Sequence, residues 1–284
     1  MNIKNSSAGP DRPETPPTDH DLSADDIRSG LKSTFWREIV CRRSVSSTND
    51  IGLSLPLDDD QGNSGVAVVA DRQEKGRGRF TRTWFSPPGL NIYLSIVLKP
   101  DIPPVDAPFL TILAALAAAA ALHRETGIPV SIKWPNDLLM SGRKLGGILT
   151  EARTAQGVIT RAVIGIGINL NSSTDDLPPE ISGKATSVLI ETGATVSRGR
   201  VTAAIMNEFE SRYKKLQAIG VVPLVQELRP LLTCLGRDIV VTDGTSKISG
   251  FAEDIDDEGR LVLRLPSGLR RKIGSGEITD TGKM

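Results

Sequence analysis

The stretch that decides the fold is KWPNDLLMSGRKLGGILTE, residues 133–151. An apolar run after Asn136-Asp137 reaches a turn signal at Ser141-Gly142, and a second apolar run follows. Two short strands joined by a tight turn fit this pattern better than a helix, because its glycines would weaken any helix. The hairpin would carry cations, a carboxylate and a carboxamide, and Gly146-Gly147 would let a ligand approach bare backbone. An ordinary hairpin with solvated charges fits the same residues, so the rest of the chain must decide.

Length, charge and cysteine content narrow the class of protein. The 284 residues can bury a core, most simply as one large domain and a small one. The 34 basic and 34 acidic residues cancel, which argues against a protein held to nucleic acid by bulk charge. Cys41 and Cys234 are the only cysteines, so we expect neither a disulfide framework nor a cysteine metal site. This usage favours a reducing, cytoplasmic setting.

Two segments bear on the membrane and on the N-terminal region. The run Leu110–Leu122 is apolar and alanine-rich but, at about 13 residues, too short to cross a bilayer. It predicts a buried helix that Asp106 can cap and Gly127 ends. The N-terminus shows no basic-then-apolar leader, so we expect no secretory signal and no membrane partner. Residues 1–33 are rich in Pro, Ser, Thr and Asp, and we expect a disordered tail there.

Two polar segments follow apolar ones in the first third of the chain. Ser46–Asp50, SSTND, precedes a short apolar helix and reads as an N-cap, or as hydroxyls and amides that bind a small polar ligand. The strand Val66–Ala70 runs into DRQEKGRGRFTRTW, residues 71–84, a positive, glycine-containing loop. That loop fits a phosphate or carboxylate ligand, a nucleic-acid backbone, or plain solvation. It lacks GxxxxGK[ST], which excludes Walker-type ATP handling.

The remaining elements give the predicted order of strands and helices. We expect a helix fragment leading to a strand at Phe35–Val45, strands at Leu90–Leu98 and Val158–Ile168, and helices at Arg198–Ala218 and Val222–Leu235. The strand at 158–168 ends in GIGINLN, whose glycines fail the dinucleotide fingerprint and more simply let the strand pass a bound group. From Gly236 onward, short alternating strands with frequent turns predict a small β-barrel.

Taken together, these segments resemble biotin protein ligases, the enzymes that attach biotin to a lysine of biotin-dependent carboxylases. The resemblance rests on Ser47-Thr48-Asn49, Gln73 with GRGR at 76–79, WFSP at 84–87, KWPND at 133–137, RKLGGIL at 143–149, GIGINLN at 165–171, ATS at 185–187 and GSGE at 274–277. It covers roughly residues 35 to 278. One such motif would be weak, but five of them in the right order are already specific.

The resemblance implies an α+β fold: a mixed β-sheet flanked by helices, with a small C-terminal SH3-like β-barrel. It implies domains at 34–235 (catalytic) and 236–284 (barrel), after the tail at 1–33. It implies the substrates biotin and ATP, the cofactor Mg²⁺, a biotinyl-5′-AMP intermediate, and a biotin carboxyl carrier domain of acetyl-CoA carboxylase as partner. A monofunctional ligase is expected, because residues 1–33 are too short for the DNA-binding domain of bifunctional relatives.

The resemblance also implies roles for individual residues. Lys144 and Arg79 would be catalytic. Biotin would be bound by Ser47, Thr48, Asn49, Gln73, Arg77, Gly78, Arg79, Lys144, Gly146 and Gly147. ATP and Mg²⁺ would be bound by Arg77, Arg79, Trp84, Lys133, Asn136, Asp137 and Asn169, with Asp137 as the metal ligand. Thr81 departs from the family's loop pattern, which has glycine there, and this would affect loop closure if the position needs a positive φ.

Two other functions stay open on the sequence. Ligases for lipoate or another acyl group share the fold. A non-enzymatic effector-binding regulator would use the Arg/Gly loop or the barrel on nucleic acid, although zero net charge and the short tail count against DNA as a partner. A homodimer and a monomer are equally compatible with the sequence.

Overall fold

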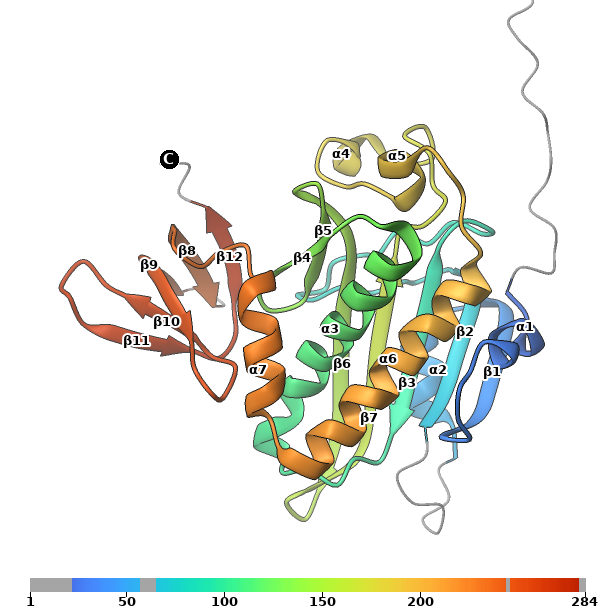
Figure 1. Cartoon of the computed structure of the whole chain (residues 1–284), viewed down its shortest axis with the longest axis horizontal. Coiled ribbons are helices and arrows are strands. Elements are labelled where there is room, and N and C mark those ends of the chain that lie inside the picture. Colours follow the sequence, from blue (N-terminus) through green and yellow to red (C-terminus); the bar gives the residue numbers. More distant parts are fainter. Residues whose placement is uncertain (1–21, 57–64, 244–245, 281–284) are drawn as a thin grey trace, which may run out of the picture.

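The structure, a computed structural model, describes residues 22–56, 65–243 and 246–280. Its larger part is a seven-stranded mixed sheet in the order β1-β2-β3-β7-β6-β5-β4 (Figure 1). The strands are β1 (Trp36–Val45), β2 (Gly65–Gln73), β3 (Ile92–Leu98), β4 (Val130–Lys133), β5 (Asp137–Met140), β6 (Arg143–Ala155) and β7 (Val158–Ile168). Only β1 and β2 pair in parallel; the other neighbours are antiparallel. The hairpin predicted from residues 133–151 is therefore present as β5–β6.

Helices cover both faces of this sheet. The long helices α3 (Ala107–Thr126) and α6 (Arg198–Ile219) lie side by side on one face with α7 (Val222–Leu228), and α2 (Thr48–Ser54) lies on the other. Successive side chains of β2 point to opposite faces of the sheet. Ala67 and Val69 join the main core under α3 and α6, while Val66 and Val68 pack under α2. A strand buried on both faces reads as a continuous apolar run, which is why GVAVVA lacks a polar alternation.

The helix α3 is the core of the large part. It is apolar and, with the 3₁₀ turn Pro104–Asp106, long enough to span a bilayer by composition, but most of it is buried inside the protein. It ends at Gly127, whose φ of 73° is left-handed, as predicted. Asp106 occupies the N-cap position, but its side chain makes no capping hydrogen bond. This burial indicates a core helix.

Two predictions for the first 45 residues are wrong. Residues 22–33 are not a disordered tail, because Ala24–Ser29 form α1, capped by Ser23 and Asp26, and Ile27 is fully buried in the main core. Residues 1–21 lie outside the described residues. The helix fragment expected within Phe35–Val45 is instead part of β1, because pairing with β2 and packing of Trp36 outweigh local propensity.

The C-terminal part is a second, five-stranded antiparallel sheet in the order β11-β10-β9-β8-β12. Its strands are β8 (Asp238–Asp243), β9 (Ser246–Ile255), β10 (Leu261–Arg264), β11 (Arg270–Ile273) and β12 (Glu277–Asp280). Figure 1 shows this sheet beside α7 and the β4–β5 end of the large sheet. The predicted α+β class with a small SH3-like barrel is confirmed; the domain limits 34–235 and 236–284 stay a prediction.

Three connecting segments matter for function. The loop from β2 to β3 contains residues 76–84, called the flap below. Two short helices, α4 (Pro179–Ser182) and α5 (Val188–Thr192), follow β7, and the 3₁₀ turn Arg229–Leu231 leads toward β8. A backbone bond from Thr233 N–H to the Ile132 carbonyl, 3.0 Å, ties this last connection to β4.

Candidate functional site

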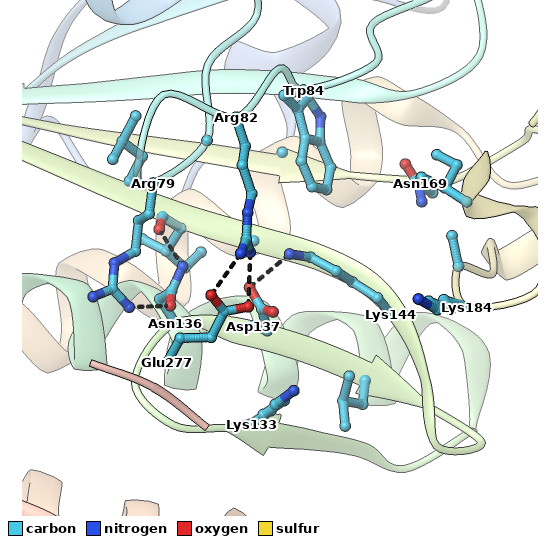
Figure 2. A pocket seen from close by; sticks show the side chains of 18 of the residues that line it. Arg79, Arg82, Trp84, Lys133, Asn136, Asp137, Lys144, Asn169, Lys184 and Glu277 are labelled. Carbon is cyan, nitrogen blue, oxygen red and sulfur yellow. Dashed lines mark hydrogen bonds and ion pairs between the residues drawn. The ribbon is translucent and has the colours of Figure 1, made fainter. Parts of the chain in front are cut away.

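A cavity of about 1200 Å³ opens where the β5–β6 hairpin, the flap, the α4–α5 segment and the C-terminal sheet meet (Figure 2). The structure brings nearly all the predicted site residues to its wall. Those that line it are Ser47, Thr48, Asn49, Gln73, Arg77, Gly78, Arg79, Trp84, Lys133, Asn136, Asp137, Lys144, Gly147 and Asn169. Of the predicted set, Gly146 is not in this lining. Residues distant in sequence thus converge on one space, as an active site requires.

Lys144 stands at the centre of the cavity floor, near the start of β6. Its Nζ lies 2.8 Å from Asp137 Oδ1 on the neighbouring strand β5, and 5.6 Å from the centroid of the Trp84 ring. The Lys144 side chain is 37% exposed, so its ammonium group faces the cavity while the protein compensates its charge. This is the geometry of a cation that a bound anion can recruit from its carboxylate partner.

The glycines of β6 and β7 make room for the protein's own side chains. A Cβ on Gly167 would lie 2.6 Å from the Trp84 ring, and one on Gly165 would lie 2.4 Å from Asn49 Oδ1. A Cβ on Gly146 would lie 2.7 Å from the Gly167 carbonyl oxygen. Asn49 and Trp84 occupy the space that these glycines leave, and Gly165 and Gly167 also border the cavity, so the expectation that GxG lets the strand pass a bound group stays a prediction. Only Gly147, of the predicted Gly146-Gly147 pair, borders the cavity.

A buried hydrogen-bond network fixes the end of the cavity near α2. The Gln73 carboxamide oxygen accepts from the Thr48 backbone N–H at 2.9 Å, and its amide donates to Ser86 Oγ at 3.1 Å. Ser95 Oγ lies 2.7 Å from Thr48 Oγ1 and 2.6 Å from Asn49 Oδ1. Ser47 is the N-cap residue of α2, but its side chain makes no capping hydrogen bond there. The Ser47 hydroxyl therefore does not act as the cap that the sequence suggested.

Asn49 and Arg77 are held by carboxylates. The Asn49 amide donates to Glu151 Oε2 at 2.7 Å, and Arg77 pairs with both Glu151, at 2.9 Å, and Asp50, at 2.8 Å. These contacts fasten the base of the flap to α2 and β6. The charge of Arg77 is thereby compensated by the protein, whereas the sequence suggested a cation directed at ligands.

The tip of the flap is fastened to the C-terminal sheet (Figure 2). Arg79 Nη1 donates to Asn136 Oδ1 at 2.9 Å and to the Gly276 carbonyl at 3.1 Å. Burial lowers the pKa of Arg79 from that of a free guanidinium, and nearby Asp137 opposes this. Arg82 forms two hydrogen bonds with the Glu277 carboxylate, at 2.8 and 2.5 Å. The flap therefore lies over the cavity in a closed position.

Thr81, at the turn of the flap, has a φ of 60°, and Phe80 before it has a φ of 54°. The position flagged in the sequence thus does require the left-handed region, in which a β-branched residue is disfavoured.

Two of the nucleotide-binding candidates are held by backbone carbonyls. The Asn136 amide donates to the Ile148 carbonyl at 3.0 Å, and the Asn169 amide donates to the Thr186 carbonyl at 3.0 Å. Lys133, at the end of β4, has no ion pair among the described residues, although its positive charge contributes to lowering the pKa of Glu277. Arg82 contributes most to that shift through its hydrogen bonds.

Sequence reasoning did not name several residues of this cavity as individual sites, among them Arg82, Lys184 and Glu277. Arg82 and Glu277 lie almost two hundred residues apart, and only the fold reveals their contact. Among residues 22–56, 65–243 and 246–280, no group of three His, Cys, Asp or Glu side chains could hold a metal ion by itself.

Comparisons with known proteins agree with this geometry. The family described as "Biotin/lipoate A/B protein ligase family" matches residues 41–169, and "Biotin protein ligase C terminal domain" matches residues 234–279. The chain is similar to the bifunctional ligase/repressor BirA of Bacillus spizizenii, with 36% identity over 258 residues that cover 90% of this chain and 78% of that protein. It is 35% identical over 238 residues to the biotin–[acetyl-CoA-carboxylase] ligase of Paracoccus denitrificans, covering 82% and 97% of the two chains.

A solved structure is similar to most of this chain. The biotin protein ligase from Aquifex aeolicus in complex with biotin and ATP has a TM-score of 0.74 and 28% identity. The match covers 86% of this chain and 98% of that one.

Proposed function

This chain belongs to the biotin protein ligase family, and from that membership we propose that it joins biotin to a lysine of a carrier protein at the expense of ATP. In the first step the biotin carboxylate attacks the α-phosphorus of ATP, which gives biotinyl-5′-AMP and pyrophosphate. In the second step the amine of the acceptor lysine attacks the acyl carbon, and AMP leaves.

The observation that carries this proposal is the place of Lys144. Two anions, a carboxylate and a polyphosphate, repel each other, and their reaction needs positive charge fixed where negative charge builds up. Lys144 supplies such a charge on the cavity floor, 2.8 Å from the Asp137 carboxylate. When the substrate anions arrive, they replace Asp137 as the partners of the ammonium group. Lys144 then lies between the biotin carboxylate and the α-phosphate.

The cavity has two ends with different chemistry, and we assign one substrate to each. Near α2, Ser47 lines the cavity beside the hydrogen-bonded pair Thr48 and Gln73, and these neutral residues offer hydroxyl and amide groups to the ureido part of biotin. Trp84 packs on Gly167 between the two ends and forms an apolar wall beside Lys144. Trp84 therefore contacts biotin at least as much as it contacts the nucleotide. Asn136, Asn169 and Lys133 face the nucleotide.

Mg²⁺ fits this site as a companion of the nucleotide. Mg²⁺ is usually held in proteins by one or two carboxylates together with substrate phosphates, so an all-protein cluster is not needed. Asp137 is the carboxylate in the right place, beside Lys144 on the cavity wall. The ion would neutralise phosphate charge when bound.

Arg79 holds the flap closed in this scheme. It connects the flap to both Asn136 and the Gly276 carbonyl, so it keeps the flap closed over the reactive adenylate. A closed flap excludes water and bystander amines until the acceptor lysine arrives.

The direct test is mass spectrometry of an apo biotin carboxyl carrier domain incubated with this protein, ATP, Mg²⁺ and biotin. The proposal predicts that one biotinyl group is added at one lysine, only when ATP is present. A parallel reaction with lipoate separates the two acyl groups named for the matching family. Lipoate transfer without biotin transfer would show that lipoate, and not biotin, is the substrate. Transfer of neither group would overturn the proposal.

A further inference from the structure

Lys184 is a cation of the cavity wall to which the scheme above gives no role. It lies just before α5, is exposed, and enters the cavity beside Asn169 (Figure 2). Within the described part of the chain, Lys184 has no ion pair, in contrast to Lys144, Arg77 and Arg82. A cation that faces a cavity without a carboxylate partner remains available to an anionic ligand.

The backbone of Lys184 is fixed directly against that of Lys144. The Lys144 N–H donates to the Lys184 carbonyl at 2.9 Å, and the Thr186 N–H donates to the Lys144 carbonyl at 2.8 Å. The segment 184–186 therefore runs alongside the start of β6 like an extra strand. Lys184 therefore adds a positive charge to the segment beside the start of β6, and in the described part of the chain no carboxylate pairs with it, whereas Asp137 pairs with Lys144.

A clamp behind the cavity holds this segment in place. Thr186 Oγ1 donates to Glu191 Oε1 at 2.5 Å, and Arg143 Nη2 donates to the same oxygen at 2.8 Å. The Glu191 side chain is only 9% exposed. Because Thr186 also accepts from the Asn169 amide, Glu191 restrains the segment that carries both Lys184 and the partner of Asn169.

We propose that Lys184 binds the phosphate groups of the nucleotide, and that Glu191 is a positioning residue that acts on Lys184 through Thr186. The inference rests on the proposed function, because it takes the nucleotide to be ATP. It adds a second cation on the Lys144 side of the cavity, supplied by the α4–α5 segment. The backbone of Lys184 is held in place by hydrogen bonds formed before any ligand arrives, which reduces the entropy lost on binding.

The first test separates nucleotide binding from biotin binding. The full chain is assayed by biotin-dependent exchange between ATP and pyrophosphate, and the KM of each substrate is measured for Lys184→Ala and Lys184→Arg. Loss of one charge-assisted hydrogen bond to phosphate predicts a rise of about tenfold in the KM for ATP for Lys184→Ala. We expect the KM for biotin to stay within about twofold, and Lys184→Arg to recover most of the loss.

The matched control is Lys215→Ala, an exposed lysine of α6 that is not in the cavity lining, which should behave as wild type. The effect of Lys184→Ala should shrink as salt is raised, because the contact is electrostatic and partly solvated. Its melting temperature should match that of wild type. An unchanged KM for ATP, or an equal rise for both substrates, would overturn the role of Lys184.

The second test asks whether Glu191 acts through Lys184. Glu191→Gln keeps the shape of the side chain and removes its charge from Arg143, which is 41% exposed and stays solvated. We expect a KM for ATP raised about threefold in the wild-type background and unchanged in the Lys184→Ala background, since coupled residues are non-additive. Equal effects in both backgrounds would refute the positioning role.

Failure of the proposed function is distinguishable from failure of this inference. If the wild-type chain gives no biotin-dependent exchange, the proposed function fails, and calorimetric binding of a non-hydrolysable ATP analogue still decides the role of Lys184. Weaker binding by Lys184→Ala than by Lys215→Ala supports the inference in that case. Equal binding by the two variants overturns it.

Discussion

The contact between the flap and the C-terminal sheet gives the most quantitative prediction. Arg82 and Glu277 face each other with two hydrogen bonds, at 2.8 and 2.5 Å. Removing the Arg82 side chain by Arg82→Ala, or the Glu277 charge by Glu277→Gln, should therefore favour an open flap. Both variants should fold, because the two side chains are 62% and 38% exposed and belong to no core.

The exposure of the pair sets the size of the effect. Exposed ion pairs contribute about 0.2–1 kcal/mol, and two-point Arg–carboxylate geometry places this pair near the upper end. Since RT is about 0.6 kcal/mol, a contribution of about 1 kcal/mol changes the ratio of closed to open flap by about fivefold. Arg82→Ala, Glu277→Gln and the double variant should show a coupling energy of that order.

Hydrogen exchange of a peptide covering residues 76–84 measures this ratio directly. We expect protection of the flap amides to fall by about fivefold in Glu277→Gln. The matched control is Glu258→Gln, which alters a glutamate that pairs with Arg260 within the C-terminal sheet. A coupling energy near zero, or equal loss of protection in the control, would refute the claim that this pair holds the flap closed.

The same contact predicts a pH dependence with a definite sign. The hydrogen bonds from Arg82 lower the pKa of Glu277 in the closed protein, so the closed form binds fewer protons than the open form. The stabilisation is thus complete above the ordinary glutamate pKa and disappears as the pH falls through the lowered value. Glu277→Gln should abolish this acid-dependent loss of protection.

Three further substitutions test separate parts of the site. Arg79→Gly should still form the adenylate but release it, labelling bystander lysines on added protein, because both flap-tip hydrogen bonds of Arg79 are lost; unchanged selectivity for the acceptor would count against this. Gly167→Ala should push Trp84 out of place and weaken biotin binding at least tenfold, whereas Gly183→Ala, with no atom near its added Cβ, should bind normally; equal affinities would contradict the packing argument. Thr81→Gly should raise flap protection by removing about 1 kcal/mol of left-handed strain, and lower protection would show that chain entropy dominates.

Much of this site could be predicted because its residues lie in contiguous motifs. The stretch 133–151 carries its own turn signal, so the hairpin follows from local pattern. The contact of Lys144 with Asp137 was not predicted and is seen only in the structure. The order of strands and helices followed in the same way, since each long element has a clear periodicity.

What could not be predicted depends on contacts between distant segments. The pairing of Arg82 with Glu277 joins a loop to the C-terminal sheet, and the clamp on Glu191 joins α5 to Arg143 at the start of β6. The prediction for the positive loop at residues 71–84 was also incomplete. Composition shows that Arg77 is charged, but not that Asp50 and Glu151 compensate this charge. Burial of Ile27 against the main core likewise overrides the polar composition of its neighbours.

The account depends most on Lys144, and Lys144→Ala tests it directly. The variant should retain the wild-type melting temperature, because the lost pair with Asp137 is partly solvated. Biotin-dependent exchange between ATP and pyrophosphate measures adenylate formation alone, before any acceptor protein is involved. We predict a loss of at least about 100-fold in that rate, the usual effect of removing a fixed charge that stabilises the transition state. An exchange rate near that of wild type would contradict the central claim that this ammonium group allows the two anions to react.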